Sequence, residues 1–169
     1  SPTAVCSAPA GGCMQPVWAA VKEDIMETVK LTYEIDGDNF NAAGDASTAV
    51  KRVLKKLRLP AQIVRRAVVC MYEGEINMVI HADGGVAELE VDEEKIVIVL
   101  KDKGPGIPDI DKAMEEGWST ASPTVRARGF GAGMGLPNMK RNADEMDIQT
   151  TLGVGTTVTM VIYIGGDGK

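Results

Sequence analysis

The residues of this chain that are best suited to chemistry lie in two glycine-rich loops. The first loop, Asp102-Lys-Gly-Pro-Gly-Ile-Pro-Asp109, directly follows a strand pattern at 95–101, and the second is Gly129-Phe-Gly-Ala-Gly-Met-Gly-Leu136. Glycine lets the backbone approach a ligand closely and adopts dihedral angles that other residues avoid. One loop that begins with a carboxylate and another that leads into a helix together indicate a nucleotide held at both ends.

The first loop has the chemistry of a base-recognition site. The carboxylate of Asp102 can accept a hydrogen bond from an exocyclic amine, which adenine offers and guanine replaces with an acceptor. This predicts ATP over GTP, because a misplaced acceptor leaves buried polar groups unpaired. Gly104 and Gly106 would let the backbone close over the base.

The second loop is expected to bind phosphate. Gly131, Gly133 and Gly135 lead into a helix predicted over 136–145, and the free N–H groups and dipole of a helix N-terminus suit an anion. Ordinary turns are the alternative, since the chain has 19 glycines. The fixed order of Asp102, these glycines and the helix favours the nucleotide site.

A helix predicted over 61–82 carries the third group. It is apolar on nearly every side and therefore expected to be buried, where an unpaired carboxylate is costly. Glu73, Asn77 and His81 nevertheless recur along one face. Asn77 could offer a neutral oxygen to Mg²⁺, and Glu73, one turn away, could take a proton from a hydroxyl or water. Each residue alone could be structural, but the shared face favours the functional interpretation.

Two further features of this helix bear on its surroundings. Gly74 costs roughly 1 kcal/mol against alanine in a helix, which predicts a close neighbour. Glu75 is a second nearby carboxylate, but at i+2 it faces elsewhere, so no role is assigned to it.

Composition fits one domain of a soluble globular protein. The chain has 169 residues, 44% hydrophobic and 25% charged, and a formal charge of −6, which argues against nucleic-acid binding. No apolar run is long enough to span a membrane, and no leader pattern begins the chain. The odd cysteine count, Cys6, Cys13 and Cys70, makes a disulfide framework improbable and favours a reducing cytoplasm.

The remaining pattern predicts an α/β two-layer sandwich, with helices on one face of a mixed or antiparallel sheet. Residues 1–27 are expected to be a flexible tail, in which a short amphipathic helix at 16–25 could pack on the domain or on a second copy. Residues 28–164 are expected to form the domain, and 165–169 a C-terminal tail. Strands are predicted at 28–35, 86–91, 95–101, 147–151 and 156–164, with 95–101 central because it is continuously aliphatic. Another helix is predicted from an Asp45 N-cap to about Leu59.

The segment 110–128 between the two glycine loops is polar at its centre and is expected to act as a lid. Arg126 and Arg128 in this lid are candidates to reach the phosphates of a bound nucleotide.

Four motifs in this order resemble those of the GHKL or Bergerat-fold ATPases. Glu73-Gly-Glu-Ile-Asn77 is similar to the N box, and Asp102-Lys-Gly-Pro-Gly-Ile107 to the G1 box. Gly131-Ala-Gly-Met-Gly-Leu136 is similar to the G2 box, and Gly153-Val-Gly-Thr-Thr157 to the final Gly-Thr motif. The resemblance covers about 28–164. It implies an α/β (α+β) two-layer sandwich with a Bergerat-type mixed sheet covered on one face by helices.

Within that family, the chain looks most like the anti-sigma regulatory factors and switch serine kinases. The N box that continues to His81, and the run 133–141, carry this likeness. It implies transfer of the ATP γ-phosphoryl group, with Mg²⁺, to a serine or threonine of a partner with an anti-sigma-antagonist (STAS) domain. Glu73 would be the general base, Asn77 the Mg²⁺ ligand and Asp102 the adenine contact. The remaining cofactor-binding residues implied are Gly104, Gly106, Ile107, Gly131, Gly133, Gly135, Leu136 and Thr157.

Two other functions remain open on the sequence. The chain could be a module that sequesters a sigma factor or another regulator and uses ATP only to set its conformation. It could also be the catalytic domain of a sensor histidine kinase, although its single histidine, His81, lies in the N-box helix. A homodimer is left open as well.

Overall fold

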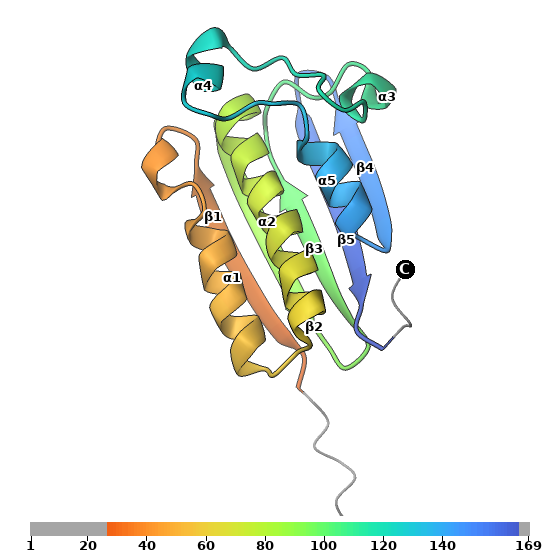
Figure 1. Ribbon diagram of the computed structural model, residues 1–169. Helices are drawn as coiled ribbons and strands as arrows, with labels where there is room; N and C mark the ends of the chain where they lie inside the picture. The colour runs from red at the N-terminus through yellow and green to blue at the C-terminus, as the bar shows by residue number, and fades with distance from the viewer. Residues whose placement is uncertain (1–26, 166–169) are drawn as a thin grey trace, which may run out of the picture.

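The computed structural model describes residues 27–165 as two layers, a five-stranded sheet and a layer of helices (Figure 1). The expected helix at 16–25, Cys6 and Cys13 lie outside these residues. In chain order the elements are β1 (Val29–Asp36), η2 (Phe40–Ala42), α1 (Asp45–Lys56), α2 (Ala61–His81), β2 (Gly84–Val91), β3 (Lys95–Lys101), α3 (Ile110–Ala113), α4 (Pro123–Ala127), α5 (Gly135–Asn142), β4 (Glu145–Thr151) and β5 (Gly155–Tyr163).

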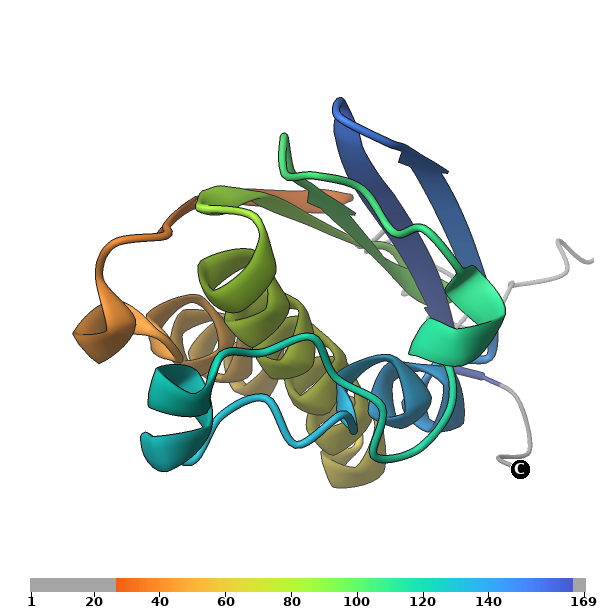
Figure 2. The ribbon, with the colours of Figure 1, turned by 90° about the horizontal axis from the view of Figure 1, so that it is seen from above.

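The sheet has the strand order β1-β2-β3-β5-β4. All four strand pairs are antiparallel, so the antiparallel alternative holds, and the mixed sheet implied by the resemblance is not found among the described strands. The aliphatic strand β3 is central, as predicted. Helices α1, α2 and α5 lie side by side on one face of the sheet (Figure 2).

The core lies between these two layers. Along β3, Ile96, Ile98 and Leu100 alternate with partly exposed residues and are 4% exposed or less, because successive side chains of a strand point to opposite faces. Helix α2 lies over the middle of the sheet, and its Cys70 and Met71 are fully buried. None of the described helices is long and apolar enough to cross a membrane.

Gly74 lies on α2 where this helix packs against β3. A Cβ at this position would lie 2.1 Å from Cδ1 of Leu100, so the buried Leu100 side chain would have to move to admit a larger residue. The close neighbour predicted from a glycine inside the helix is therefore confirmed.

Helix α1 begins differently from the prediction. Its N-cap is Gly44, at φ +105° and without a side-chain cap, whereas Asp45 is already helical. The Glu75 carboxylate supplies the acceptors instead, because Oε1 receives the N–H of Ala46 at 3.1 Å and Oε2 that of Ser47 at 3.2 Å. Only 2% of Glu75 is exposed. This carboxylate, for which no role was predicted, caps a neighbouring helix.

Two predicted helices are shorter than expected. Helix α1 ends at Lys56 and not near Leu59. Helix α5 ends at Asn142, because Glu145 already pairs with Val161 as the first residue of β4. The competing strand pairing therefore sets the end of α5.

Candidate nucleotide-binding site

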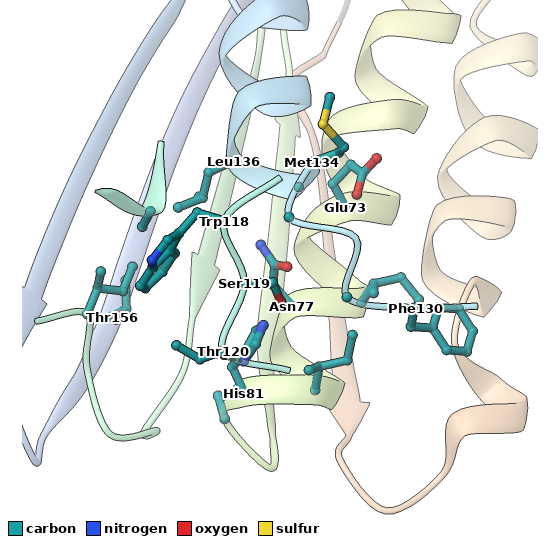
Figure 3. Close-up of a pocket in the computed structure, with 18 of the residues that line it drawn as sticks. Glu73, Asn77, His81, Trp118, Ser119, Thr120, Phe130, Met134, Leu136 and Thr156 are labelled. Carbon is teal, nitrogen blue, oxygen red and sulfur yellow. Dashed lines mark hydrogen bonds between the residues drawn. The ribbon is translucent and has the colours of Figure 1, made fainter. Parts of the chain in front are cut away.

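A cavity of about 400 Å³ opens at the C-terminal end of α2. Its walls come from α2, the first glycine loop (102–109), the lid (110–128), the second glycine loop (129–136) and the start of β5. Figure 3 shows Asn77 and His81 on α2, with Trp118 and Thr156 on the opposite side. This volume and mixed lining are typical of a small-molecule site.

The cavity brings together most of the residues that the sequence predicted. Those in its lining are Glu73, Asn77, Asp102, Gly106, Ile107, Gly131, Gly133, Gly135 and Leu136. Two other predicted residues, Gly104 and Thr157, are not in the lining. His81, which shares a face of α2 with Glu73 and Asn77, is part of the lining.

Glu73 and Asn77 contribute from successive turns of α2. Oε1 of Glu73 accepts a hydrogen bond of 2.7 Å from Nδ2 of Asn138, on α5. Among the described residues, Oε2 of Glu73 has no hydrogen-bond partner. The carboxylate is therefore held by one oxygen, and the other can accept a proton.

The amide of Asn77 faces the start of α5. A Cβ on Gly135 would lie 2.9 Å from Oδ1 of Asn77, so glycine keeps that oxygen uncovered. Within residues 27–165, the Asn77 amide has no hydrogen-bond partner, and no cluster of three or more His, Cys, Asp or Glu could hold a metal ion. One neutral protein oxygen fits Mg²⁺, which keeps most of its ligands as phosphate and water.

Asp102 is fixed through one of its oxygens. Oδ1 accepts the N–H of Gly104 at 2.8 Å and that of Thr156 at 3.1 Å, while Oδ2 has no partner among the described residues. The absence of a side chain at Gly155 permits this approach, because a Cβ at that position would lie 2.1 Å from the Asp102 carbonyl oxygen. One oxygen thus positions the carboxylate, and the other can accept an amine.

The first glycine loop is anchored to β4 and β5 by threonines. The N–H of Ile107 donates to Oγ1 of Thr150 at 2.8 Å, and that hydroxyl lies 2.9 Å from Oγ1 of Thr156. Gly106 has φ +79°, and its Cβ would lie 2.7 Å from the Thr151 carbonyl oxygen. The role of Thr150 was not predicted, because its partners are far away in the sequence.

Gly104 and Thr157 lie just outside the cavity. Gly104 lines a neighbouring surface depression, where its N–H holds Asp102 in place. Thr157 follows buried Thr156 on β5, and consecutive strand residues point to opposite faces. Thr156, and not Thr157, is therefore the residue of this pair that lines the cavity.

The second glycine loop is packed against the lid. The Gly117 N–H donates to the Gly133 carbonyl at 2.9 Å. Gly133 has φ +74°, and a Cβ there would lie 2.4 Å from the carbonyl carbon of Gly117. A Cβ on Gly131 would lie 2.3 Å from Cβ of Ala121. Glycine at both positions lets the loop and lid close over one wall of the cavity.

The two lid arginines do not line the cavity. Nη2 of Arg126 donates to the carbonyl of Ser119 at 2.9 Å, within the lid itself. The guanidinium of Arg128 lies 4.9 Å from the centre of the Phe40 ring, and Phe40 also packs against Phe130. In this conformation both arginines hold the lid rather than face a phosphate site.

Sequence reasoning did not single out several lining residues, notably Trp118, Phe130 and Met134 (Figure 3). Trp118 and Phe130 stand in or beside a polar lid in a chain with 4% aromatic residues, and that signal could have identified them. Desolvation lowers the pKa of His81 below its ordinary value, and the charge of Asp102 opposes this effect. His81 is thus held towards its neutral form.

Comparison with known proteins agrees with this geometry. Residues 37–162 match the model of the histidine kinase-like ATPase domain. The serine/threonine-protein kinase RsbT of Bacillus subtilis (strain 168) is 33% identical over 104 residues, 62% of this chain and 67% of that protein. The anti-sigma F factor of Thermoanaerobacter sp. (strain X514) is 33% identical over 107 residues, 63% of this chain and 67% of that protein.

A solved structure shares the fold. The crystal structure of the RsbU and RsbW domains of Rv1364c from Mycobacterium tuberculosis aligns with a TM-score of 0.54 and 17% sequence identity. The alignment covers 79% of this chain and 31% of that longer chain. The family match takes in β2, β3, β4, nearly all of β5, the helices and both glycine loops, and the chain belongs to the histidine kinase-like ATPase domain family.

Proposed function

We propose that this protein is an ATP-dependent protein serine/threonine kinase of the anti-sigma regulatory factor type. One observation supports this function above all. Glu73 and Asn77, one turn apart on α2, line the same cavity as Asp102. The residues proposed as proton acceptor, metal ligand and base-recognition carboxylate are thus all part of one cavity.

Asp102 would recognise the adenine. Its Oδ1 is occupied by two backbone N–H groups, which leaves Oδ2 to accept the exocyclic amine. Guanine presents an acceptor at that position, so two acceptors would face each other without a proton between them. ATP is therefore the expected nucleotide.

The second glycine loop would hold the phosphates. Gly133 and Gly135 expose backbone N–H groups before and at the start of α5, where the helix dipole favours negative charge. The oxygen of Asn77, uncovered opposite Gly135, would hold Mg²⁺. When bound, Mg²⁺ would neutralise charge on the phosphates.

Glu73 would act as the general base. An incoming seryl or threonyl hydroxyl oxygen forms a bond to the γ-phosphorus, while the bond between that phosphorus and the bridging oxygen breaks and ADP leaves. The hydroxyl proton passes to the Glu73 carboxylate and then to solvent. Oε2, which has no partner among the described residues, is the oxygen available for this proton.

The phosphoacceptor would be a serine or threonine of a STAS-domain protein, and the site of action the cytoplasm. The name of the Bacillus subtilis relative, a serine/threonine-protein kinase, supports the chemistry at 33% identity. A homodimer stays an expectation from the sequence.

Transfer of labelled phosphate from ATP to a purified STAS-domain partner tests the function. Glu73→Gln keeps the size of the side chain but removes the base, so transfer should fall by about 10²–10⁴-fold. Glu34→Gln, an exposed carboxylate on β1, is the matched control and should retain full transfer. Full transfer by Glu73→Gln would exclude Glu73 as the base.

A second candidate is a sequestering module that binds a sigma factor in an ATP-dependent manner. The name of the Thermoanaerobacter relative, anti-sigma F factor, supports it. Complex formation with a sigma factor that needs ATP, without any phosphate transfer, would favour this candidate. Transfer that needs Glu73 would favour the kinase.

A further inference from the structure

Glu73 is not held by its own helix but by a side chain of α5. Nδ2 of Asn138 donates to Oε1 of Glu73 at 2.7 Å. Both residues are partly buried, and α2 and α5 pack directly against each other. This contact joins the proposed base to the helix that begins at the second glycine loop.

The orientation of the Asn138 amide is fixed from its other end. Nη1 of Arg141, one turn along α5, donates to Oδ1 of Asn138 at 3.2 Å. An amide has donors only on its nitrogen and acceptors only on its oxygen. A flipped amide would lose the bond from Arg141 and turn its oxygen towards the Glu73 carboxylate.

The same arginine contacts the lid. Arg141 forms an ion pair with Glu116, which directly precedes Gly117, the residue bonded to the second glycine loop. A continuous line of polar contacts therefore runs from the lid through Arg141 and Asn138 to Glu73. The ion pair is exposed and adds little stability by itself.

We propose that Asn138 is a positioning residue for phosphoryl transfer, which orients the Glu73 carboxylate so that Oε2 is presented to the incoming hydroxyl. This inference rests on the proposed function, because it takes Glu73 as the base. Asn138 does not line the cavity and so acts through Glu73. Arg141 holds Asn138 in the amide orientation that this role needs.

The test compares two asparagines of α5. Asn138→Leu removes the amide that holds Glu73, and kcat for phosphoryl transfer should fall about 10–100-fold because the base is misplaced. The dissociation constant of ATP should stay at the wild-type value. Asn142→Leu removes a 2.8 Å bond from Asn142 to the Asn138 carbonyl, a helical contact that does not reach Glu73, and should leave kcat unchanged.

A double-mutant cycle separates the two proposals. If Asn138 acts through Glu73, adding Asn138→Leu to Glu73→Ala should cause no further loss. Multiplied losses in the double variant, or an unchanged kcat in Asn138→Leu alone, would overturn the positioning role. An unaffected rate in Glu73→Ala would overturn the proposed base instead.

A spectroscopic measurement needs no partner protein. The side-chain amide signals of Asn138 in the NMR spectrum should shift when Glu73→Ala removes the carboxylate, while those of Asn142 stay in place. Unshifted Asn138 signals would show that the amide does not bond Glu73 in solution, and would overturn the inference independently of any activity.

Discussion

Oδ1 of Asp102 and the backbone N–H of Thr156 lie 3.1 Å apart, which ties the end of β3 to the start of β5 beneath the cavity. Because β3 and β5 are paired in the sheet, this carboxylate is held where two hydrogen-bonded strands meet the first glycine loop. The first glycine loop starts at the same residue. The proposed adenine contact and a link between β3 and β5 therefore share one side chain.

The first prediction separates these two roles of Asp102. Asp102→Asn keeps an oxygen for the N–H groups of Gly104 and Thr156 but places an NH₂ group where Oδ2 stood. Two donors would then face each other, and ATP affinity should fall about 10–100-fold, while the melting temperature changes little. Calorimetric titration with ATP measures this.

The exposed Asp147 on β4 provides the matched control for that substitution, since it lies away from the cavity. Asp147→Asn should bind ATP as the wild type does. An Asp102→Asn variant with wild-type ATP affinity would rule out the adenine contact.

The second prediction concerns Glu75, whose role is structural. Glu75→Leu leaves the N–H groups of Ala46 and Ser47 without acceptors at the start of α1. The free energy of unfolding should fall by about 2–4 kcal/mol, measured by urea denaturation. Glu73→Gln, two residues earlier, should leave that free energy nearly unchanged and affect transfer alone. Equal destabilisation by both substitutions would contradict a structural role for Glu75 that Glu73 does not share.

The third prediction concerns the contact between lid and second glycine loop. Gly133→Ala places a Cβ 2.4 Å from the carbonyl carbon of Gly117, and the φ of +74° at residue 133 is one that alanine rarely adopts. The loop must move, so ATP affinity should fall about tenfold or more. Gly129→Ala is the control, because Gly129 has φ +87° but no neighbour within 4 Å of a Cβ. If both variants lose the same affinity, backbone strain alone, and not the lid contact, determines the effect.

Much of the site could be predicted because its signals are local. Glycines before a helix, a carboxylate after an aliphatic strand, and polar residues four apart on one helix each reflect geometry within a few residues. Glu73, Asn77 and Asp102 accordingly meet in one cavity. The central place of β3 and the close neighbour of Gly74 follow from the same kind of local pattern.

The structure adds to the sequence where distant segments decide the outcome. Whether Thr156 or Thr157 faces the cavity depends on strand register, and a shift of one residue reverses the face. The partners of Glu75 and of Glu73 come from other helices, α1 and α5. No periodicity within α2 could identify those partners, because packing between helices creates the contacts.

The lid arginines show how local contacts bear on an expectation that rests on charge. Arg126 and Arg128 have the charge that a phosphate needs, and on that ground the sequence makes them candidates to reach one. In the structure Arg126 donates a hydrogen bond to the Ser119 carbonyl, and the guanidinium of Arg128 lies over the Phe40 ring. Charge predicts what a side chain can bind, whereas the local backbone decides which partner it reaches.

The last prediction concerns the buried thiol of Cys70. Burial raises its pKa to about 12, with Arg66 acting to lower the pKa and Glu73 to raise it. The pKa in the unfolded chain is about 8.5. The contribution of the neutral thiol to the free energy of unfolding is therefore fully present below about pH 8.5. It is lost as the pH rises towards 12, by at most about 1.4 kcal/mol per pH unit.

Urea denaturation under reducing conditions at pH 7.5 and pH 10, for wild type and Cys70→Ala, measures this loss. Cys70→Ala is destabilised at both pH values by the lost packing, but the difference between the two proteins should shrink at pH 10, because only the wild type loses the thiol contribution. A difference that stays constant with pH would contradict the raised pKa.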